Sequence, residues 1–217
     1  MKASIHIGLL SISLLLTSLG IAAQELRIGV DYDRMLPAKL EFTSKVQLRK
    51  ILIPQNTYYV ILQVGLEYEI FENLSLAGTY RYSLTPTEMS ENLLESFDEK
   101  RRSTAEAKYK LPRFDKGIRL SYRLRYQNSA THEGESKDYL RNRLKADYKL
   151  TKELRPYIAL EPYYRLGKNE MSKIRLSLGS EINIVRTEIE LSYIIELNTH
   201  DDNGTWTSHM IGLFLKL

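Results

Sequence analysis

After the first 23 residues, apolar and polar residues alternate along most of the chain with a period of two. Every second residue from Val60 to Ile70 is apolar, and polar residues such as Glu67 lie between them. The segment from Ile118 to Gln127 repeats the pattern, with Arg123 among the residues of its polar face. A helix would spread these apolar residues around its axis, so the alternation predicts β-strands.

About eleven segments of roughly 10 to 13 residues show this alternation, which is the length that crosses a bilayer as a tilted strand. The links between them alternate in length. Short turns follow Ile70, Leu150 and Ile184, with a slightly longer one over 112–116, whereas longer polar links cover 85–100, 128–137, 166–171 and 198–204. Short turns on one side and longer loops on the other are typical of outer-membrane barrels.

Tyrosines mark both ends of the predicted strands on their apolar face. Four of them precede short turns: Tyr32, Tyr68, Tyr109 and Tyr148. Three lie where strands enter long loops: Tyr82, Tyr126 and Tyr164. Tyrosine favours strands in general, which explains its abundance but not two clusters on one face. Two membrane interfaces select such rings, so we predict two aromatic girdles.

The two ends of the chain favour export and a membrane barrel over a soluble, lipocalin-like barrel with its apolar face inside. Lys2, the apolar stretch 5–19 and the small residues before Gln24 predict a signal peptide over 1–23, cleaved after Ala23. A membrane anchor helix is the alternative, but the stretch is short for spanning. The last strand alternates up to Leu217 and resembles the signal recognised by outer-membrane assembly machinery, although a terminal Phe or Trp is more usual.

The sequence therefore predicts an all-β fold over 24–217, an antiparallel transmembrane β-barrel in the outer membrane of a Gram-negative bacterium. Eleven segments conflict with the even strand number of single-chain bacterial barrels. Counted back from Leu217, the segment over 25–34 would begin on the outer side. Either the strands near 39–53 are miscounted or the first segment is not part of the wall, so we expect about 10 to 12 strands.

Two stretches of the predicted barrel have a recognisable pattern, the hairpin over 66–76 and the run 139–144 leading into 147–150. With these stretches, the whole predicted barrel resembles an uncharacterised, domain-of-unknown-function family of small bacterial outer-membrane barrels. These patterns are shared by many barrels. The resemblance implies location and fold, and it brings no activity, cofactor or catalytic residue with it.

Composition excludes several other classes of protein. After the N-terminus there is no apolar run of about 20 residues, which excludes a membrane bundle of helices. The absence of cysteine excludes disulfides, thiolate metal sites and a cysteine nucleophile. The net charge of +4 is mild and both signs are interspersed, so we expect no nucleic-acid partner. Outer-membrane lipid and the assembly machinery are the partners we expect.

No catalytic or metal constellation stands out. Ser208 and His209 are adjacent, which places them on opposite faces of a strand and not in a nucleophile–base pair. His132 and His200 fall in loops, and the acidic run after His200 lacks the remaining ligands of a calcium loop. We therefore predict no enzyme activity, no metal and no cofactor.

The polar face carries the most suggestive chemistry. Two consecutive strands place six basic residues in the predicted lumen, and strands further along give it an acidic face: Arg119, Arg123, Arg125, Arg141, Arg143 and Lys145, against Glu181, Glu188, Glu190 and Glu196. Opposed walls of this kind orient a permeating solute. A small barrel can instead be filled by its own side chains, whose buried charges then have to pair.

Two functions follow and both stay open at this point. One is a narrow channel for small polar or anionic solutes, based on the basic stripe. The other is a closed structural or binding barrel whose extracellular loops, chiefly 85–100, contact a partner. The sequence does not name the solute or the partner.

Overall fold

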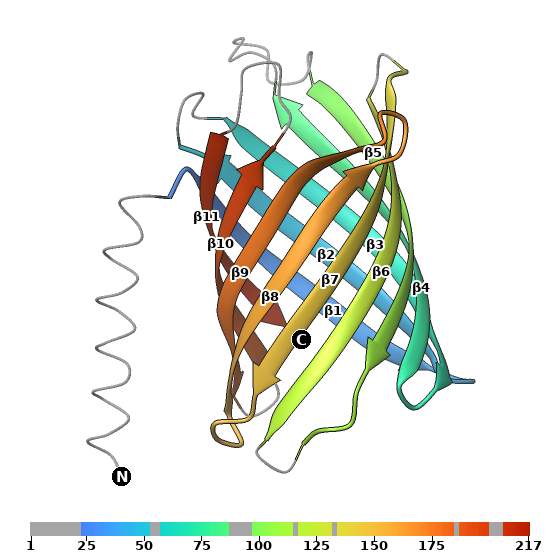
Figure 1. The fold of residues 1–217 in the computed structure, drawn as a ribbon, viewed down its shortest axis with the longest axis vertical. Helices are drawn as coiled ribbons and strands as arrows, with labels where there is room; N and C mark the ends of the chain where they lie inside the picture. Colours follow the sequence, from blue (N-terminus) through green and yellow to red (C-terminus); the bar gives the residue numbers. More distant parts are fainter. Residues whose placement is uncertain are drawn as a thin grey trace.

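A computed structural model of the protein describes residues 23–52, 57–86, 97–114, 117–131, 134–184, 187–199 and 206–217. These residues form a closed barrel of eleven strands (Figure 1). The strands are β1 (Glu25–Leu36), β2 (Leu40–Ile51), β3 (Tyr58–Phe71), β4 (Leu74–Pro86), β5 (Phe97–Lys110), β6 (Ile118–Thr131), β7 (Ser136–Tyr148), β8 (Leu154–Arg165), β9 (Glu170–Ile184), β10 (Thr187–Asn198) and β11 (Trp206–Lys216). The predicted fold class is confirmed. Over the same residues, no helix could cross a membrane.

The barrel closes through a parallel pair between its first and last strands. Every strand pairs antiparallel with its neighbour in the chain, but β1 and β11 run in the same direction, from Glu25 opposite Met210 to Asp31 opposite Lys216. Neither sequence-based explanation of the odd count is therefore right, because β1 is a wall strand and β2 is one continuous strand. Strands that alternate in direction leave the first and last parallel whenever their number is odd.

The two ends of the barrel differ. The links β3–β4 and β9–β10 have two residues each and lie at one end of the barrel, whereas β1 begins at the opposite end, which also holds the ten-residue link β4–β5 (Figure 1). The predicted contrast in length is only partial, because the link β5–β6 at the first end has seven residues and the links β6–β7 and β8–β9 at the other end have four each. We call these two ends the short-turn end and the long-loop end. The link predicted over 85–100 is shorter than expected, because β4 extends to Pro86 and β5 starts at Phe97. Residues 1–22, 87–96 and 200–205 lie outside the described residues, so the signal peptide stays a prediction.

The period of two sorts the side chains as expected, with apolar residues outside and polar residues inside. In β1, Ile28 is 57% exposed whereas its neighbour Arg27 is 6% exposed. Leu144 in the middle of β7 is 53% exposed, and charged residues such as Asp147 are buried. An apolar outer wall is the opposite of the lipocalin-like arrangement, which this orientation excludes.

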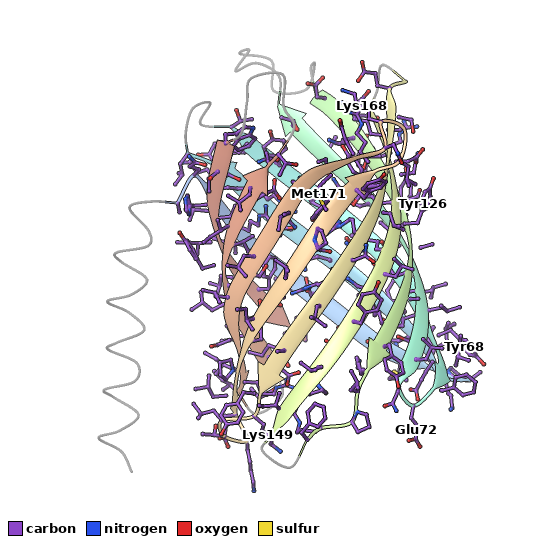
Figure 2. The ribbon with its side chains drawn as sticks, viewed as in Figure 1. Tyr68, Glu72, Tyr126, Lys149, Lys168 and Met171 are labelled. Atoms are coloured by element: carbon purple, nitrogen blue, oxygen red, sulfur yellow. The ribbon has the colours of Figure 1, made fainter. Side chains whose placement is uncertain are left out.

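Tyrosines lie on the outer wall at both ends. Tyr68 lies toward the short-turn end and Tyr126 toward the long-loop end (Figure 2). Tyr32, Tyr109 and Tyr148 are also exposed, while Tyr82 and Tyr164 are half-buried. The hydroxyl of Tyr126 donates to Asp138 Oδ1 at 2.9 Å. This placement fits two girdles, whose role at membrane interfaces stays a prediction.

Aromatic rings lie close to glycines on the lumen side of the wall. A Cβ at Gly179 would lie 2.6 Å from Cζ of Tyr157, and a Cβ at Gly212 would lie 2.8 Å from Cε2 of Phe214. Both rings are almost fully buried. Only a residue without a side chain leaves room for a ring at this distance, so these glycines let the aromatic residues cover the inner wall.

Candidate functional site

Among the described residues, two large cavities lie in the lumen, one toward each end. The long-loop chamber has a volume of about 460 Å³. It is lined by residues from the strand halves nearer the long-loop end, among them Arg49, Arg81, Arg102, Arg175, Glu196 and Trp206. The short-turn chamber has a volume of about 500 Å³ and is lined among others by Asp31, Glu67, Arg143, Lys145, Glu181 and Lys216. Both volumes are in the range of small-molecule sites.

The two chambers differ in charge. Of the described residues that line the long-loop chamber, ten are basic and three are acidic: Arg27, Arg49, Arg81, Lys100, Arg102, Arg125, Lys137, Arg141, Lys173 and Arg175, against Glu25, Glu135 and Glu196. The lining of the short-turn chamber is nearly balanced: Lys108, Lys110, Arg119, Arg123, Arg143, Lys145, Arg155 and Lys216, against Asp31, Asp33, Glu41, Glu67, Asp147, Glu181 and Glu188. The excess of positive charge is therefore concentrated at the long-loop end.

Three pairs of arginines lie directly opposite each other on neighbouring strands in the long-loop chamber. The pairs are Arg27 with Arg49, Arg81 with Arg102, and Arg125 with Arg141. Like charges opposite each other destabilise a sheet unless other groups neutralise them. The presence or absence of a neutralising carboxylate distinguishes the three pairs.

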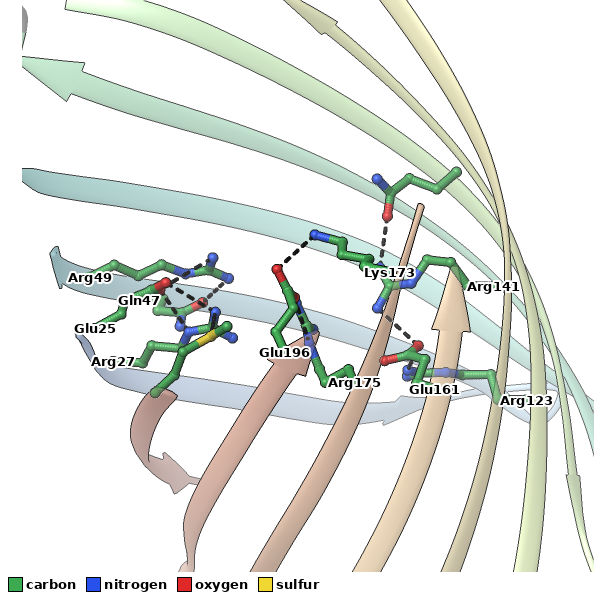
Figure 3. Close-up of polar contacts among 12 residues, drawn as sticks. Glu25, Arg27, Gln47, Arg49, Arg123, Arg141, Glu161, Lys173, Arg175 and Glu196 are labelled. Atoms are coloured by element: carbon green, nitrogen blue, oxygen red, sulfur yellow. Dashed lines mark hydrogen bonds and ion pairs between the residues drawn. The ribbon is translucent and has the colours of Figure 1, made fainter. Parts of the chain in front are cut away.

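Carboxylates neutralise two of these pairs. Glu25 lies 2.8 Å from Nε of Arg27 and 3.6 Å from Nη1 of Arg49 (Figure 3). Glu106 lies 2.7 Å from Nη2 of Arg125. Arg141 donates from Nη2 to Glu161 at 2.9 Å, and its guanidinium stacks 4.1 Å from the ring centre of Tyr163.

The pair of Arg81 and Arg102 has no such carboxylate. Among the described residues, no acidic side chain lies within 4.0 Å of either guanidinium. Arg81 donates from Nε and Nη2 to Oε1 of Gln63, at 2.9 and 2.6 Å. Arg102 donates from Nε to Oγ of Ser129 at 3.2 Å. Neutral acceptors hold these two cations in place without cancelling their charge.

A belt of ion pairs separates the two chambers. Glu161 of β8 accepts hydrogen bonds from Arg123 at 3.0 Å and from Arg141 at 2.9 Å (Figure 3). Arg123 lines the short-turn chamber, whereas Arg141 lines the long-loop chamber. Glu106 extends the belt toward β5, 3.8 Å from Nη1 of Arg123. Because Glu161 is almost fully buried, its charge depends on these arginines.

The far wall of the long-loop chamber is paired in the same way. Glu196 of β10 accepts from Nζ of Lys173 at 3.0 Å and from Nε of Arg175 at 3.1 Å (Figure 3). Positive charge without an acidic partner therefore faces the chamber mainly from β4 and β5.

The predicted basic stripe is on the lumen side but is largely neutralised. Arg119 lies 3.0 Å from Asp147, and Lys145 lies 2.5 Å from Glu181. Arg123, Arg125 and Arg141 belong to the belt described above. Of the six predicted residues, Arg143 alone has no carboxylate within 4.0 Å among the described residues. The stripe as a pore lining stays a prediction.

The predicted acidic residues are also engaged. Glu188 lies 2.5 Å from Arg155 and 2.6 Å from Lys216. Glu190 accepts from the hydroxyl of Tyr157 at 2.6 Å. Sequence reasoning paired basic and acidic walls across the lumen, but most of these contacts join strands one or two apart, because those side chains are within reach.

Sequence reasoning did not single out Arg81 and Arg102. Both lie at the lumen phase of their strands, which the alternation predicts. Whether the two arginines lie opposite each other depends on the register between β4 and β5. A long link separates these strands, and its length does not determine which residues pair.

Ser208 and His209 are separated by the wall, as predicted. Ser208 lines the long-loop chamber, whereas Nδ1 of His209 lies 2.7 Å from the hydroxyl of Tyr193. His132 and His200 lie outside the described residues. Within the described part of the chain, no group of three or more His, Asp or Glu side chains could hold a metal ion.

A family model described as a protein of unknown function, DUF2490, matches residues 28–207, which is most of the barrel. The chain belongs to the DUF2490 family. This DUF2490 family carries no assigned activity in its description, in agreement with the resemblance noted from the sequence. No curated protein matches the chain.

Several solved structures are similar to this DUF2490 barrel, and two of them are described here. LpxR from Salmonella typhimurium matches with a TM-score of 0.51 and 7% identity, over 82% of this chain and 83% of that chain. An anion-selective porin from Comamonas acidovorans matches with a TM-score of 0.39 and 13% identity, over 84% of this chain and 54% of that chain. At 7% identity the likeness to LpxR shows the fold alone.

Proposed function

We propose that this protein lies in the outer membrane of a Gram-negative bacterium and that its lumen admits small anions from the long-loop end. The observation that carries the proposal is the charge of the long-loop chamber, where basic lining residues outnumber acidic ones by ten to three among the described residues. Rings of basic side chains are the usual lining of pores for anions and phosphates.

The outer wall supports the location. Aliphatic residues cover its middle and tyrosines lie toward both ends, as lipid and its two interfaces require. Outer-membrane lipid is the partner proposed for this wall. The alternation of β11 up to the end of the chain supports recognition by the barrel-assembly machinery during biogenesis. Co-fractionation with the outer membrane and a gel shift on boiling test the location.

Charge focusing gives the mechanism of selection. A cleft with low-dielectric walls and one sign of charge raises the local concentration of the opposite ion. The long-loop chamber therefore concentrates anions, while the nearly balanced short-turn chamber neither attracts nor repels them strongly. An anion that crosses would pass the belt at Glu161 by exchanging contacts with Arg141 and Arg123.

Bilayer recordings of the purified protein in a salt gradient test the proposal. We expect single-channel openings with a reversal potential shifted toward that of chloride. Replacing Arg81 and Arg102 together by Gln lowers this anion preference. Replacing Arg143 and Lys110 by Gln removes as many charges from the short-turn chamber and leaves the preference nearly unchanged. A wild-type channel that prefers cations contradicts the proposal.

The belt favours a second candidate function, a closed barrel that binds without conducting. Glu106, Glu161 and their arginines occupy the region between the chambers, and such a network can fill a small barrel. In that case the folded protein, shown to be folded by its gel shift, gives no openings at all. The loop over 85–100, most of which lies outside the described residues, is then the proposed contact surface for a partner.

A further inference from the structure

The pair of Arg81 and Arg102 has the placement that an anion site requires. The two residues are directly opposite on β4 and β5, face the long-loop chamber, and have no acidic partner within 4.0 Å among the described residues. Two cations held together in this way repel each other. A bound anion between them would remove that cost, as Glu106 and Glu161 do for the next arginines.

The donors of this pair are fixed in position and point to an oxyanion. Gln63 holds Nε and Nη2 of Arg81, and Ser129 holds Nε of Arg102. Nη1 of Arg81 and both Nη groups of Arg102 have no acceptor among the described residues. Gln63 and Ser129 therefore orient the two guanidinium forks and leave their outer N–H groups free for a ligand.

The surroundings add charge and space. Lys100 lies two residues before Arg102 on the same face of β5 and is exposed at the lining of the chamber. On the other side of the pair, Oγ1 of Thr79 and Oγ1 of Thr104 lie 2.6 Å apart and satisfy each other. The free donors therefore face the cavity of about 460 Å³, which is large enough for a phosphorylated small molecule.

We propose that Arg81 and Arg102, with Lys100 beside them, bind a free phosphoryl oxyanion that enters from the long-loop end. The inference rests on the proposed function of the long-loop chamber and names its ligand class. A phosphoryl group presents three oxygens and close to two negative charges, which two guanidinium forks and an ammonium match. A carboxylate fills one fork only. The strand wall separates the site from lipid, so the source is the solvent.

Titration with inorganic phosphate tests the site. The purified mature protein is titrated in phosphate-free detergent at constant ionic strength. Binding is followed by isothermal titration calorimetry and by tryptophan fluorescence. Trp206 is the single tryptophan of the chain and lines the same chamber, so its emission reports on this site. We expect saturable binding in both readouts and none when chloride replaces phosphate.

Matched variants locate the binding. Arg81→Gln and Arg102→Gln each remove one charge-assisted contact, and each should weaken phosphate binding about tenfold or more. Arg143→Gln removes an arginine that also lacks a carboxylate partner among the described residues, but from the short-turn chamber, and should leave the affinity unchanged. Loss of one member of a repelling pair should not prevent folding, and the gel shift on boiling checks this for each variant.

Three results overturn the inference: no saturable response to phosphate, an equal loss of affinity in Arg143→Gln, or a response seen only when the micelles contain a phosphomonoester lipid such as phosphatidic acid. Binding is measured without permeation, so the two proposals fail separately. A barrel that binds phosphate but never opens retains this site and refutes the channel. A barrel that conducts anions but does not bind phosphate supports the channel and refutes the phosphate site.

Discussion

The ring of Phe214 lies against Gly29 across the seam between β11 and β1. A Cβ at Gly29 would lie 2.9 Å from Cδ1 of Phe214, so the ring reaches over the neighbouring strand on the lumen side. Nζ of Lys45 lies 4.3 Å from the centre of the same ring. The contact joins the two ends of the barrel wall at the parallel pair, where the register covers only Glu25–Asp31 and Met210–Lys216.

A cysteine pair tests this closure. Ile28 and Leu213 are partners in the parallel register, both are exposed on the outer wall, and the chain has no cysteine of its own. Under mild oxidation the double variant Ile28→Cys/Leu213→Cys should form a crosslink, seen as a reducible change in gel mobility. Ile28→Cys/Leu191→Cys, with β11 between the two sites, should not. A barrel with an additional strand in the seam would give no crosslink in the first variant.

Gly179 should not tolerate a side chain. A Cβ there would lie 2.6 Å from both Cζ of Tyr157 and the backbone oxygen of Leu191, and the backbone cannot move aside easily. Overpacking of this kind costs about 1–3 kcal/mol, so Gly179→Ala should lower the temperature at which the gel shift is lost. Gly78→Ala is the matched control, because its Cβ would meet nothing closer than 4.0 Å. Equal loss in both variants would contradict the packing described.

Removal of the carboxylate at Glu161 should weaken the barrel. Glu161→Gln removes the negative charge that Arg123 and Arg141 share in a buried position, and breaking a buried pair in this way costs about 3 kcal/mol. Denaturant unfolding in detergent measures the change. Glu135→Gln breaks an exposed pair with Lys137 and should cost less than about 1 kcal/mol. Unchanged unfolding of Glu161→Gln would show that the belt is not needed for stability.

Because the apolar face points outward, the cost of a charged substitution on it should depend on how deep the residue lies in the membrane. Leu144 lies in the middle of β7 on the outer wall, where an arginine would cost about 2–4 kcal/mol in a bilayer. Phe71 lies at the end of β3, where the same change costs about 1 kcal/mol or less. Refolding into lipid vesicles should therefore tolerate Phe71→Arg far better than Leu144→Arg. The reverse order would place the membrane elsewhere.

The period of two was enough to predict the wall of this protein. Alternation in segments such as Val60–Ile70 defines both the strand and its outer face, because side chains on a strand point alternately to its two sides. The number of strands near ten to twelve follows from the same signal. The parallel closure between β1 and β11 does not follow from the alternation, because the relative direction of these two strands depends on the number of strands in the whole barrel.

The site was predicted less completely, for a physical reason. Alternation assigns Arg123, Arg143 and Arg81 to the lumen, but it gives no partner for any of them. Partners depend on register, which places Glu161 between Arg123 and Arg141 and leaves Arg81 opposite Arg102. The stripe predicted as the pore lining is therefore mostly neutralised, and the cations without acidic partners lie on β4 and β5.

Charge inversion at this pair tests the central claim most directly. The double variant Arg81→Glu/Arg102→Glu lowers the charge of the long-loop chamber by four, because two positive charges are removed and two negative charges are added, and it leaves the short-turn chamber unchanged. In a salt gradient across a bilayer, the wild type should show a reversal potential on the chloride side and the variant one shifted toward the potassium side. The same reversal potential in both channels would contradict the claim that this chamber selects anions.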